Sequence, residues 1–288
     1  MTEPRVDTSI ELRDGRRLGY AEYGEAEGRP VFLFHGNPGS RFEWMRVADP
    51  EILRGVRAIA PDRPGFGVSD FHPGRTHLDW ANDVGALADH LGLERFSIIG
   101  FSSGGAHALA CAVAMSGRIE TLGLISCVAP LNILAAFDGM SRPNKRDLQL
   151  ARAAPLLSRI WMSWVARRTV RAARRRVGQA SNAADLLKQT MILRNLSEAY
   201  RQGARGVAYE LTLRSRPWAF DAAQVTTQTF LWQGEADDNV PLPMGRYLDG
   251  VLPNCEATFV PEGRHALHGR RMEEILSKVM DLRAAGLN

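Results

Sequence analysis

Short apolar runs alternate with segments of helical periodicity along the first half of the chain. Two alternating segments flank an Asp-Gly turn signal, and four further runs have the apolar pattern of strands. Strands are therefore predicted at 9–13, 17–23, 31–34, 57–60, 96–99 and 121–128. Apolar residues recur every three or four positions in 77–91, which predicts a helix, and a second helix is predicted at 104–115. Strands that alternate with helices predict an α/β fold with a mostly parallel, doubly wound sheet.

The pattern changes after the sixth predicted strand, because only helical signals occur between Pro130 and Pro217. Apolar side chains in this segment share one helical face at Leu156, Leu157, Ile160, Trp161, Trp164 and Val165. The later pattern predicts strands at 229–233 and 257–260 and helices at 244–252 and 271–283. The expected organisation is an α/β core of residues 1–129 and 217–288, interrupted by a helical insertion at 130–216.

Composition narrows the class of protein. The chain has 288 residues, of which 45% are hydrophobic, so it can bury a sizeable core and is not a disordered chain. Residues 96–117 carry no charge and are long enough to span a bilayer, but their central Ser-Ser-Gly-Gly favours a buried strand, a turn and a helix. Three cysteines without a C-x-x-C pair predict a reducing compartment. Because the N-terminus lacks the apolar segment of a signal peptide, we expect a cytoplasmic protein.

The positive charge comes almost entirely from arginine. The formal net charge is +4, which is too small to indicate a nucleic-acid partner. Six arginines cluster on the helix that carries the apolar stripe, at Arg167, Arg168, Arg171, Arg174, Arg175 and Arg176. Such a cluster would suit an anionic membrane surface or an acidic substrate, but a solvated helix face is the more common case. No membrane contact is therefore expected, and the protein is expected to be a monomer or a homodimer.

The strongest chemical signal is the G-x-S-x-G pattern at residues 100–104, Gly-Phe-Ser-Ser-Gly. It follows the predicted strand 96–99 and precedes a predicted helix, which is the setting of a nucleophile elbow. The glycines let the strand and the helix approach each other closely around a turn with Ser102 at its tip. The helix N-terminus adds N–H groups and a positive dipole end. A loop that only caps the helix is the alternative, and the context favours a nucleophile.

A serine nucleophile needs a base, and the chain has seven histidines. His265 lies between the last predicted strand and the final helix, so it belongs to the same edge of the sheet as Ser102. His268 is the rival, expected in the first helical turn as a surface or supporting residue. His107 lies five residues beyond Ser102, and we expect it to be buried or interfacial.

The base needs an acid that fixes its tautomer and stabilises the imidazolium. Asp237 follows the predicted strand 229–233 by a short turn and is the preferred candidate. Asp238 and Glu235 are alternatives, and a surface turn would use the same residue types.

The order Ser102, Asp237, His265 along the chain is the triad order of the α/β hydrolases. On these residues the sequence resembles the α/β-hydrolase superfamily over essentially its whole length. The core motifs cover 8–129 and 217–285, and the insertion at 130–216 is similar to the helical cap of that family.

The resemblance also gives expectations for two loops. Residues 35–39, His-Gly-Asn-Pro-Gly, are similar to the oxyanion loop, which implies that the backbone N–H groups of Asn37 and Ser103 hold the oxyanion. Each donor would contribute on the order of 3 kcal/mol to the transition state. His35 is expected to be structural. Residues 61–69 resemble the Asp-Arg-x-Gly-x-Gly-x-Ser loop of the family, and we expect that loop to support the fold and not to bind phosphate.

Several reaction types are excluded by the pattern. A serine at the elbow argues against dehalogenase and epoxide-hydrolase chemistry, because those relatives use an aspartate nucleophile. No cluster has metal-ligand spacing, and no G-x-G-x-x-G follows the first strand of a βαβ unit. No metal and no cofactor are therefore expected.

The expected activity is an esterase-like serine hydrolase (EC 3.1.1) that acts through an acyl-enzyme on a small hydrophobic acyl substrate. Phe101, Phe137, Trp161 and Trp164 are candidate pocket residues, with Leu156 beside them, although these side chains would also serve to pack the insertion onto the core. A carbon–carbon bond hydrolase, a lactonase or an iminopeptidase-like enzyme would use the same triad. A ligand receptor, an acyltransferase and a cofactor-free peroxidase are further alternatives.

Overall fold

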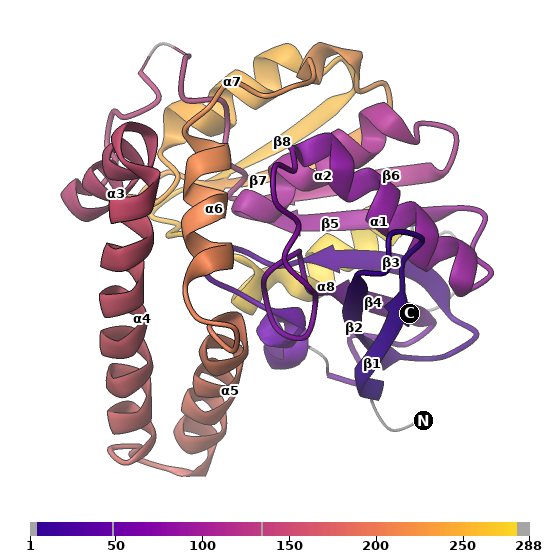
Figure 1. Cartoon of the computed structure of the whole chain (residues 1–288). Coiled ribbons are helices and arrows are strands. Elements are labelled where there is room, and N and C mark those ends of the chain that lie inside the picture. Colours follow the sequence, from indigo (N-terminus) through magenta and orange to yellow (C-terminus); the bar gives the residue numbers. More distant parts are fainter. Residues whose placement is uncertain (1–4, 48, 134, 281–288) are drawn as a thin grey trace.

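One eight-stranded sheet runs through the centre of the molecule, and the computed structural model describes residues 5–47, 49–133 and 135–280 of the chain (Figure 1). The strands are β1 (Arg5–Glu11), β2 (Arg17–Gly24), β3 (Arg29–Phe34), β4 (Val56–Pro61), β5 (Phe96–Phe101), β6 (Ile119–Ile125), β7 (Gln228–Gly234) and β8 (Cys255–Val260). Their order is β1-β2-β4-β3-β5-β6-β7-β8. Strand β2 pairs antiparallel with both β1 and β4. The remaining pairs are parallel, so β4, β3, β5, β6, β7 and β8 run in one direction. The mostly parallel α/β sheet predicted from the sequence is confirmed.

Helices cover both faces of the sheet, as a doubly wound fold requires. One face carries α1 (His77–His90), α2 (Ser103–Ala114), the short η2 (Ala222–Gln224) and α7 (Leu242–Val251). The other face carries η1 (Arg41–Val47) and α8 (His268–Met280). Large side chains such as Trp80 on α1 and Trp44 in η1 are fully buried against the strands. The central strand β5 is buried at every position because both of its faces are covered.

The uncharged stretch at 96–117 contains strand β5 and helix α2, joined by a tight turn. None of the described helices combines the length and the apolar character that a membrane crossing requires. Strand β6 ends at Ile125, three residues before the predicted end, because Ser126 adopts a positive φ of 46° that an extended strand does not allow. The final helix begins at His268, earlier than predicted, and its predicted last residues lie outside the described part of the chain.

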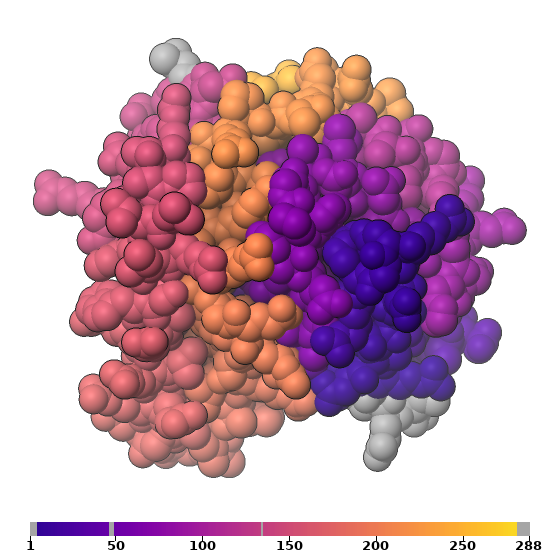
Figure 2. All heavy atoms as spheres, viewed as in Figure 1, coloured from indigo at the N-terminus to yellow at the C-terminus, as the bar shows by residue number. Residues whose placement is uncertain are grey.

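Four α-helices precede the short η2 in the described part of the segment between β6 and β7. They are α3 (Arg142–Ala153), α4 (Pro155–Val177), α5 (Ala183–Ala199) and α6 (Arg205–Arg214). Within the described residues from 126 to 227 there is no strand, in agreement with the helical pattern. The four helices stand together beside the carboxyl ends of the parallel strands (Figure 1), and α3 and α4 form the left edge of the molecule in the space-filling view (Figure 2). The boundaries of a separate cap at 130 and 216 stay a prediction.

Helix α6 packs directly against the loop that follows β4. A Cβ atom on Gly206 would lie 2.3 Å from the carbonyl oxygen of Gly65, so both backbones approach closely because residue 206 is glycine. One turn further on, Glu210 is buried and accepts a hydrogen bond from Arg75 at 2.7 Å. The same carboxylate lies 3.1 Å from the Nε2 atom of His107 on α2. These contacts fix α6 to α2 and to the loop before α1.

His107 is buried, as expected, and its surroundings affect its protonation. Burial lowers the pKa of His107 to about 4, although the nearby Glu210 carboxylate raises it. His77 packs against His107 with ring centres 4.8 Å apart, and burial lowers the pKa of His77 to about 3. In the unfolded chain both imidazoles titrate at their ordinary pKa, about 6.5. The unfolded state therefore binds more protons than the folded state at mildly acidic pH, so folding loses stability as the pH falls below that value.

We predict that His107→Gln makes the stability less sensitive to acid. Between pH 7.5 and 5.0 the native chain should lose about 2 kcal/mol of unfolding free energy through His107 alone, because only the unfolded state is protonated there. Urea unfolding at the two pH values measures this loss. The variant should show a loss smaller by about that amount.

The matched control is His90→Gln at the end of α1, because His90 is exposed and water surrounds it in both states. The control should keep the acid sensitivity of the native chain. An unchanged sensitivity in the His107 variant would show that His107 is protonated in the folded state.

Candidate active site

The turn between β5 and α2 holds Ser102 in a conformation that most residues avoid. Ser102 has a φ of 55° and a ψ of −121°, and its N–H donates to the carbonyl of Ile125 at 2.9 Å. A Cβ atom on Gly104 would lie 2.5 Å from the carbonyl oxygen of Phe34, so the turn can pack against β3 because residue 104 is glycine. The surrounding packing therefore holds the strained serine in place, as is typical of functional sites.

Asp237 and His265 are in direct contact, although 28 residues separate them. The Nδ1 atom of His265 lies 2.8 Å from Oδ2 of Asp237. The side chain of Asp237 has no exposure to water, and its Oδ1 accepts hydrogen bonds from the N–H groups of Asn239 and Val240 at 2.8 and 3.0 Å. These backbone donors hold the carboxylate in one orientation. Its second oxygen thereby fixes the position of the imidazole ring.

Ser102 and His265 line the same cavity, which has a volume of about 500 Å³. Among the described residues, Ser102 Oγ makes no hydrogen bond to His265, whereas the hydrogen bond between His265 and Asp237 is formed. The ring of His265 is tilted against Phe101 with ring centres 4.9 Å apart. Ser126 also donates to the carbonyl of His265 at 2.9 Å. The histidine backbone and ring are therefore both held at the edge of the cavity.

The loop after β3 is positioned by Arg63, a residue that the sequence analysis treated only as part of a supporting loop. The Arg63 guanidinium is fully buried and donates to the carbonyls of His35 and Gly36, the latter at 2.9 Å. It also lies 3.3 Å from Oγ of Ser103. Arg63 thus links the segment that carries Asn37 to the first residue of α2. As the first residue of its helix, Ser103 has a backbone N–H without an acceptor in that helix.

Arg63 depends on the carboxylate of Glu210 from α6. The Nε atom of Arg63 lies 3.4 Å from Glu210, and Arg75 approaches the same carboxylate from the other side at 2.7 Å. Burial lowers the pKa of Arg63 to about 10, so it stays charged near neutral pH. Burial also raises the pKa of Glu210, but the charges of Arg63 and Arg75 outweigh this effect and hold it well below the ordinary value.

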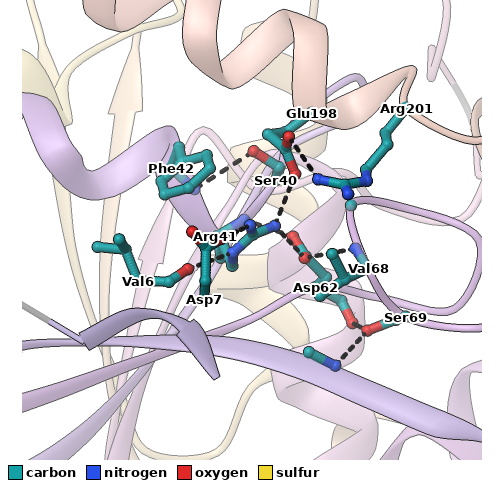
Figure 3. Close-up of polar contacts among 12 residues, drawn as sticks. Val6, Asp7, Ser40, Arg41, Phe42, Asp62, Val68, Ser69, Glu198 and Arg201 are labelled. Atoms are coloured by element: carbon teal, nitrogen blue, oxygen red, sulfur yellow. Dashed lines mark hydrogen bonds and ion pairs between the residues drawn. The ribbon is translucent and has the colours of Figure 1, made fainter. Parts of the chain in front are cut away.

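A second buried arginine, Arg41, organises the far side of the same loops (Figure 3). Its guanidinium donates to Asp62 at 2.8 Å and to Glu198 of α5 at 2.9 Å. It also reaches Asp7 of β1 at 2.6 Å. Asp62 in turn accepts from the N–H of Val68 at 3.1 Å, which closes the glycine-rich loop after β4. The expected supporting role of that loop agrees with these contacts.

The residues predicted for the pocket walls lie in different parts of the structure. Of the four candidate pocket residues, Phe101 lines the cavity, whereas Phe137 packs against the buried apolar cluster on the face of the sheet that α1 and α2 cover. Trp161 stacks on Trp164 with ring centres 5.0 Å apart, and Trp164 is 51% exposed. Leu156 is also exposed. The apolar residues of α4 surround much of the helix, so their spacing did not indicate which face points inward.

Other residues of the helical segment form the cavity wall. Met162, Val165 and Thr169 present the inner face of α4, and several polar side chains join them. The remaining lining residues are Gly36, Asn37, Pro38, Glu43, Asn144, Asp147, Leu148, Ile192, Asn195, Leu196, Tyr200, Val207, Leu211, Arg214 and Asn239. The cavity therefore offers charged groups as well as an apolar wall. Sequence reasoning missed Glu43, Asn195 and Arg214 because nothing local in the chain marks them.

The rival histidine lies elsewhere in the site. His268 lies in the first turn of α8, as expected, and because it is buried it fits the second of its two expected roles, a supporting residue and not a surface residue. Its ring packs against Phe101 and Trp44 at 4.3 and 5.5 Å, and its Nε2 atom lies 3.8 Å from Glu43. His268 therefore supports the wall behind the site. Among the described residues, no group of three or more His, Cys, Asp and Glu side chains is arranged to hold a metal ion.

Comparison with known proteins identifies the family. The model of the alpha/beta hydrolase family matches residues 31–278, so the chain belongs to that family. A non-heme chloroperoxidase from Streptomyces lividans is 36% identical over 128 residues, which cover 43% of this chain and 46% of that protein. A 2-hydroxy-6-oxo-2,4-heptadienoate hydrolase from Pseudomonas putida is 36% identical over 106 residues, 35% of this chain and 38% of the relative. The matches thus span less than half of these curated relatives.

The fold has close structural neighbours at lower sequence identity. A thermophilic esterase from Thermogutta terrifontis superimposes with a TM-score of 0.66 at 20% identity, covering 98% of this chain and 99% of the esterase. At this identity the likeness shows the fold alone.

We predict that Glu210→Gln strongly destabilises the protein. The substitution keeps the shape of the side chain but leaves the buried Arg63 and Arg75 without the carboxylate that both approach. Removing one partner of a buried ion pair costs about 3–5 kcal/mol. Urea unfolding should show a loss of that size, while Glu235→Gln on the exposed loop after β7 should change stability by less than about 0.5 kcal/mol. Equal stability of the two variants would contradict the prediction.

Proposed function

We propose that this protein is a serine hydrolase that cleaves an ester or a related acyl bond through an acyl-enzyme. The observation that carries the proposal is the hydrogen bond between buried Asp237 and His265, because His265 lines the same cavity as Ser102 on its strained turn. Membership of the alpha/beta hydrolase family supports a hydrolytic reaction, and the esterase with the same fold is consistent with an ester substrate.

In the proposed reaction, Ser102 Oγ attacks the carbonyl carbon while the Nε2 atom of His265 takes its proton. Asp237 keeps the other nitrogen of the ring protonated and stabilises the imidazolium. The backbone N–H groups of Asn37 and Ser103 stabilise the oxyanion. His265 then donates its proton to the leaving alcohol as the bond to the carbonyl carbon breaks. Water attacks the acyl-enzyme by the reverse proton transfers and releases the acid.

A second candidate function is hydrolysis of a carbon–carbon bond in a substrate that carries a carboxylate. The observation that favours it is Arg214, which lines the cavity from α6 and whose guanidinium, among the described residues, donates a hydrogen bond only to the carbonyl of Asn239, at 3.4 Å. Within the described part of the chain, Arg214 forms no ion pair. Burial lowers its pKa to about 10, so it remains a cation near neutral pH. The Pseudomonas putida relative is named for a dienoate, which is such an anion.

The first test of the proposed function is covalent labelling by a fluorophosphonate, read by intact mass. The native chain should gain one adduct, whereas Ser102→Ala and His265→Gln should gain none in the same time, because the nucleophile or its base is missing. His268→Gln and Ser116→Ala, an exposed serine after α2, are controls that should still be labelled. An adduct on the Ser102 variant, or loss of labelling in the His268 variant alone, would contradict the assignment of nucleophile and base.

The two candidate functions differ in what Arg214 does. Arg214→Gln should raise KM for a half-ester with a free carboxylate by about tenfold to a hundredfold, because a charge-assisted hydrogen bond is lost. The neutral diester of the same acid should keep its KM. Steady-state kinetics on the two esters, and on 2-hydroxy-6-oxo-2,4-heptadienoate, measure this difference. Equal changes in KM for the neutral and the charged ester would exclude Arg214 as a carboxylate-binding residue.

A further inference from the structure

The outer face of α4 carries apolar side chains that nothing in the described structure covers. Leu156 is 78% exposed, Ile160 69%, Leu157 59% and Trp164 51%. These residues follow one another at helical spacing, so they share one side of the first three turns. A contiguous exposed apolar patch on a soluble domain usually marks an interaction site.

Helix α4 does not need these side chains for its own packing. Its opposite face carries Met162, Val165 and Thr169, which line the cavity, and the buried Ala166 packs toward Phe66. The helix is therefore anchored from within, while the outer side chains remain available to a partner.

Positive charge is concentrated on the same helix. Helix α4 contains seven arginines and no acidic residue. Residues 142–177 hold eleven of the 36 Lys and Arg residues of the chain, but only one of its 32 Asp and Glu residues. The rest of the chain therefore carries more acidic than basic side chains, and the small net charge hides a strongly basic region.

The arginines of the second half of α4 line a surface hollow. Arg167, Arg171 and Arg174 follow at spacings of four and three residues, so they share one side of the helix. Together with Ser163 of α4 and Ser197 of α5 they border a hollow of about 550 Å³. On an ideal helix this side continues the line of Leu156 and Ile160. Guanidinium groups bind phosphate oxygens in two-pronged contacts, so the hollow suits a phosphate group.

We propose that the outer face of α4 docks this protein on a membrane surface rich in anionic phospholipid. Leu156, Ile160 and Trp164 enter the boundary between headgroups and acyl chains, and the arginines of the second half contact lipid phosphates. The combination of an apolar end and a basic end on one exposed helix face is the pattern of interfacial helices. This docking does not depend on the proposed catalytic function.

Charge and exposed apolar area argue against two other partners for the outer face of α4, a second copy of the chain and nucleic acid. A symmetric contact between two copies through the apolar patch would bring two arginine-rich helices together, and their like charges would repel. Nucleic acid would satisfy the arginines, but Leu156, Leu157 and Ile160 would stay in water. An anionic membrane satisfies both halves of the helix.

The experiment is flotation of the full chain with vesicles of phosphatidylcholine alone and of phosphatidylcholine with 30% phosphatidylglycerol. We expect binding to the anionic vesicles and at least tenfold weaker binding to the neutral ones. Two triple variants test the two halves, namely L156S/I160S/W164S and R167Q/R171Q/R174Q. Each should lower the partition coefficient on anionic vesicles by about tenfold or more, because each removes one of the two contributions to interfacial binding.

The matched control is R13Q/R54Q/R95Q, which removes the same charge from exposed positions outside helices α3 to α6. It should bind within twofold of the native chain, and thermal unfolding should show that all variants are folded. Absence of native binding, or an equal loss in the control, would overturn the proposal. If the native chain does not bind vesicles, two further measurements show what covers this face instead. Sedimentation would detect a dimer formed through the apolar patch, and duplex DNA would test binding through the arginines.

Discussion

The arrangement of the rest of this structure depends on two arginine side chains with no access to water, Arg41 and Arg63. A buried guanidinium charge is tolerated only when a carboxylate and further acceptors surround it. Arg41 begins η1 and Arg63 lies in the loop after β4, and each takes a carboxylate from the helices between β6 and β7, Glu198 from α5 and Glu210 from α6. Ion pairs with buried arginines, as well as packing, therefore hold those helices against the core.

The same pairing explains how the candidate site is preorganised. Arg63 holds the carbonyls of His35 and Gly36 and contacts Ser103, so the two segments expected to supply oxyanion donors share one rigid partner. Asp237 accepts hydrogen bonds from two backbone N–H groups, which fix its carboxylate, and the fixed carboxylate in turn orients the ring of His265. Preorganised groups of this kind need no rearrangement when charge develops in a reaction.

Helix α4 combines two different surfaces on one element. Its inner face, with Met162 and Val165, forms part of the cavity wall, and its outer face is apolar at one end and basic at the other. The cavity itself is more polar than a pocket for a purely hydrophobic acyl group, because Glu43, Asp147 and Arg214 line it. Substrate choice in such a cavity depends on where a polar substrate group meets these charges as well as on apolar fit.

The sequence by itself determined the α/β architecture, the turn at Ser102 and the neighbourhood of Asp237 and His265. Strand and helix periods, glycine at the elbow and the shared edge of parallel strands are local or topological properties that a single sequence contains. The tertiary structure alone decided which carboxylate balances Arg63, since Glu210 lies far along the chain and has no local signature. It also decided which face of α4 points inward, because apolar residues on several sides of a helix leave that choice to the surface that the helix meets.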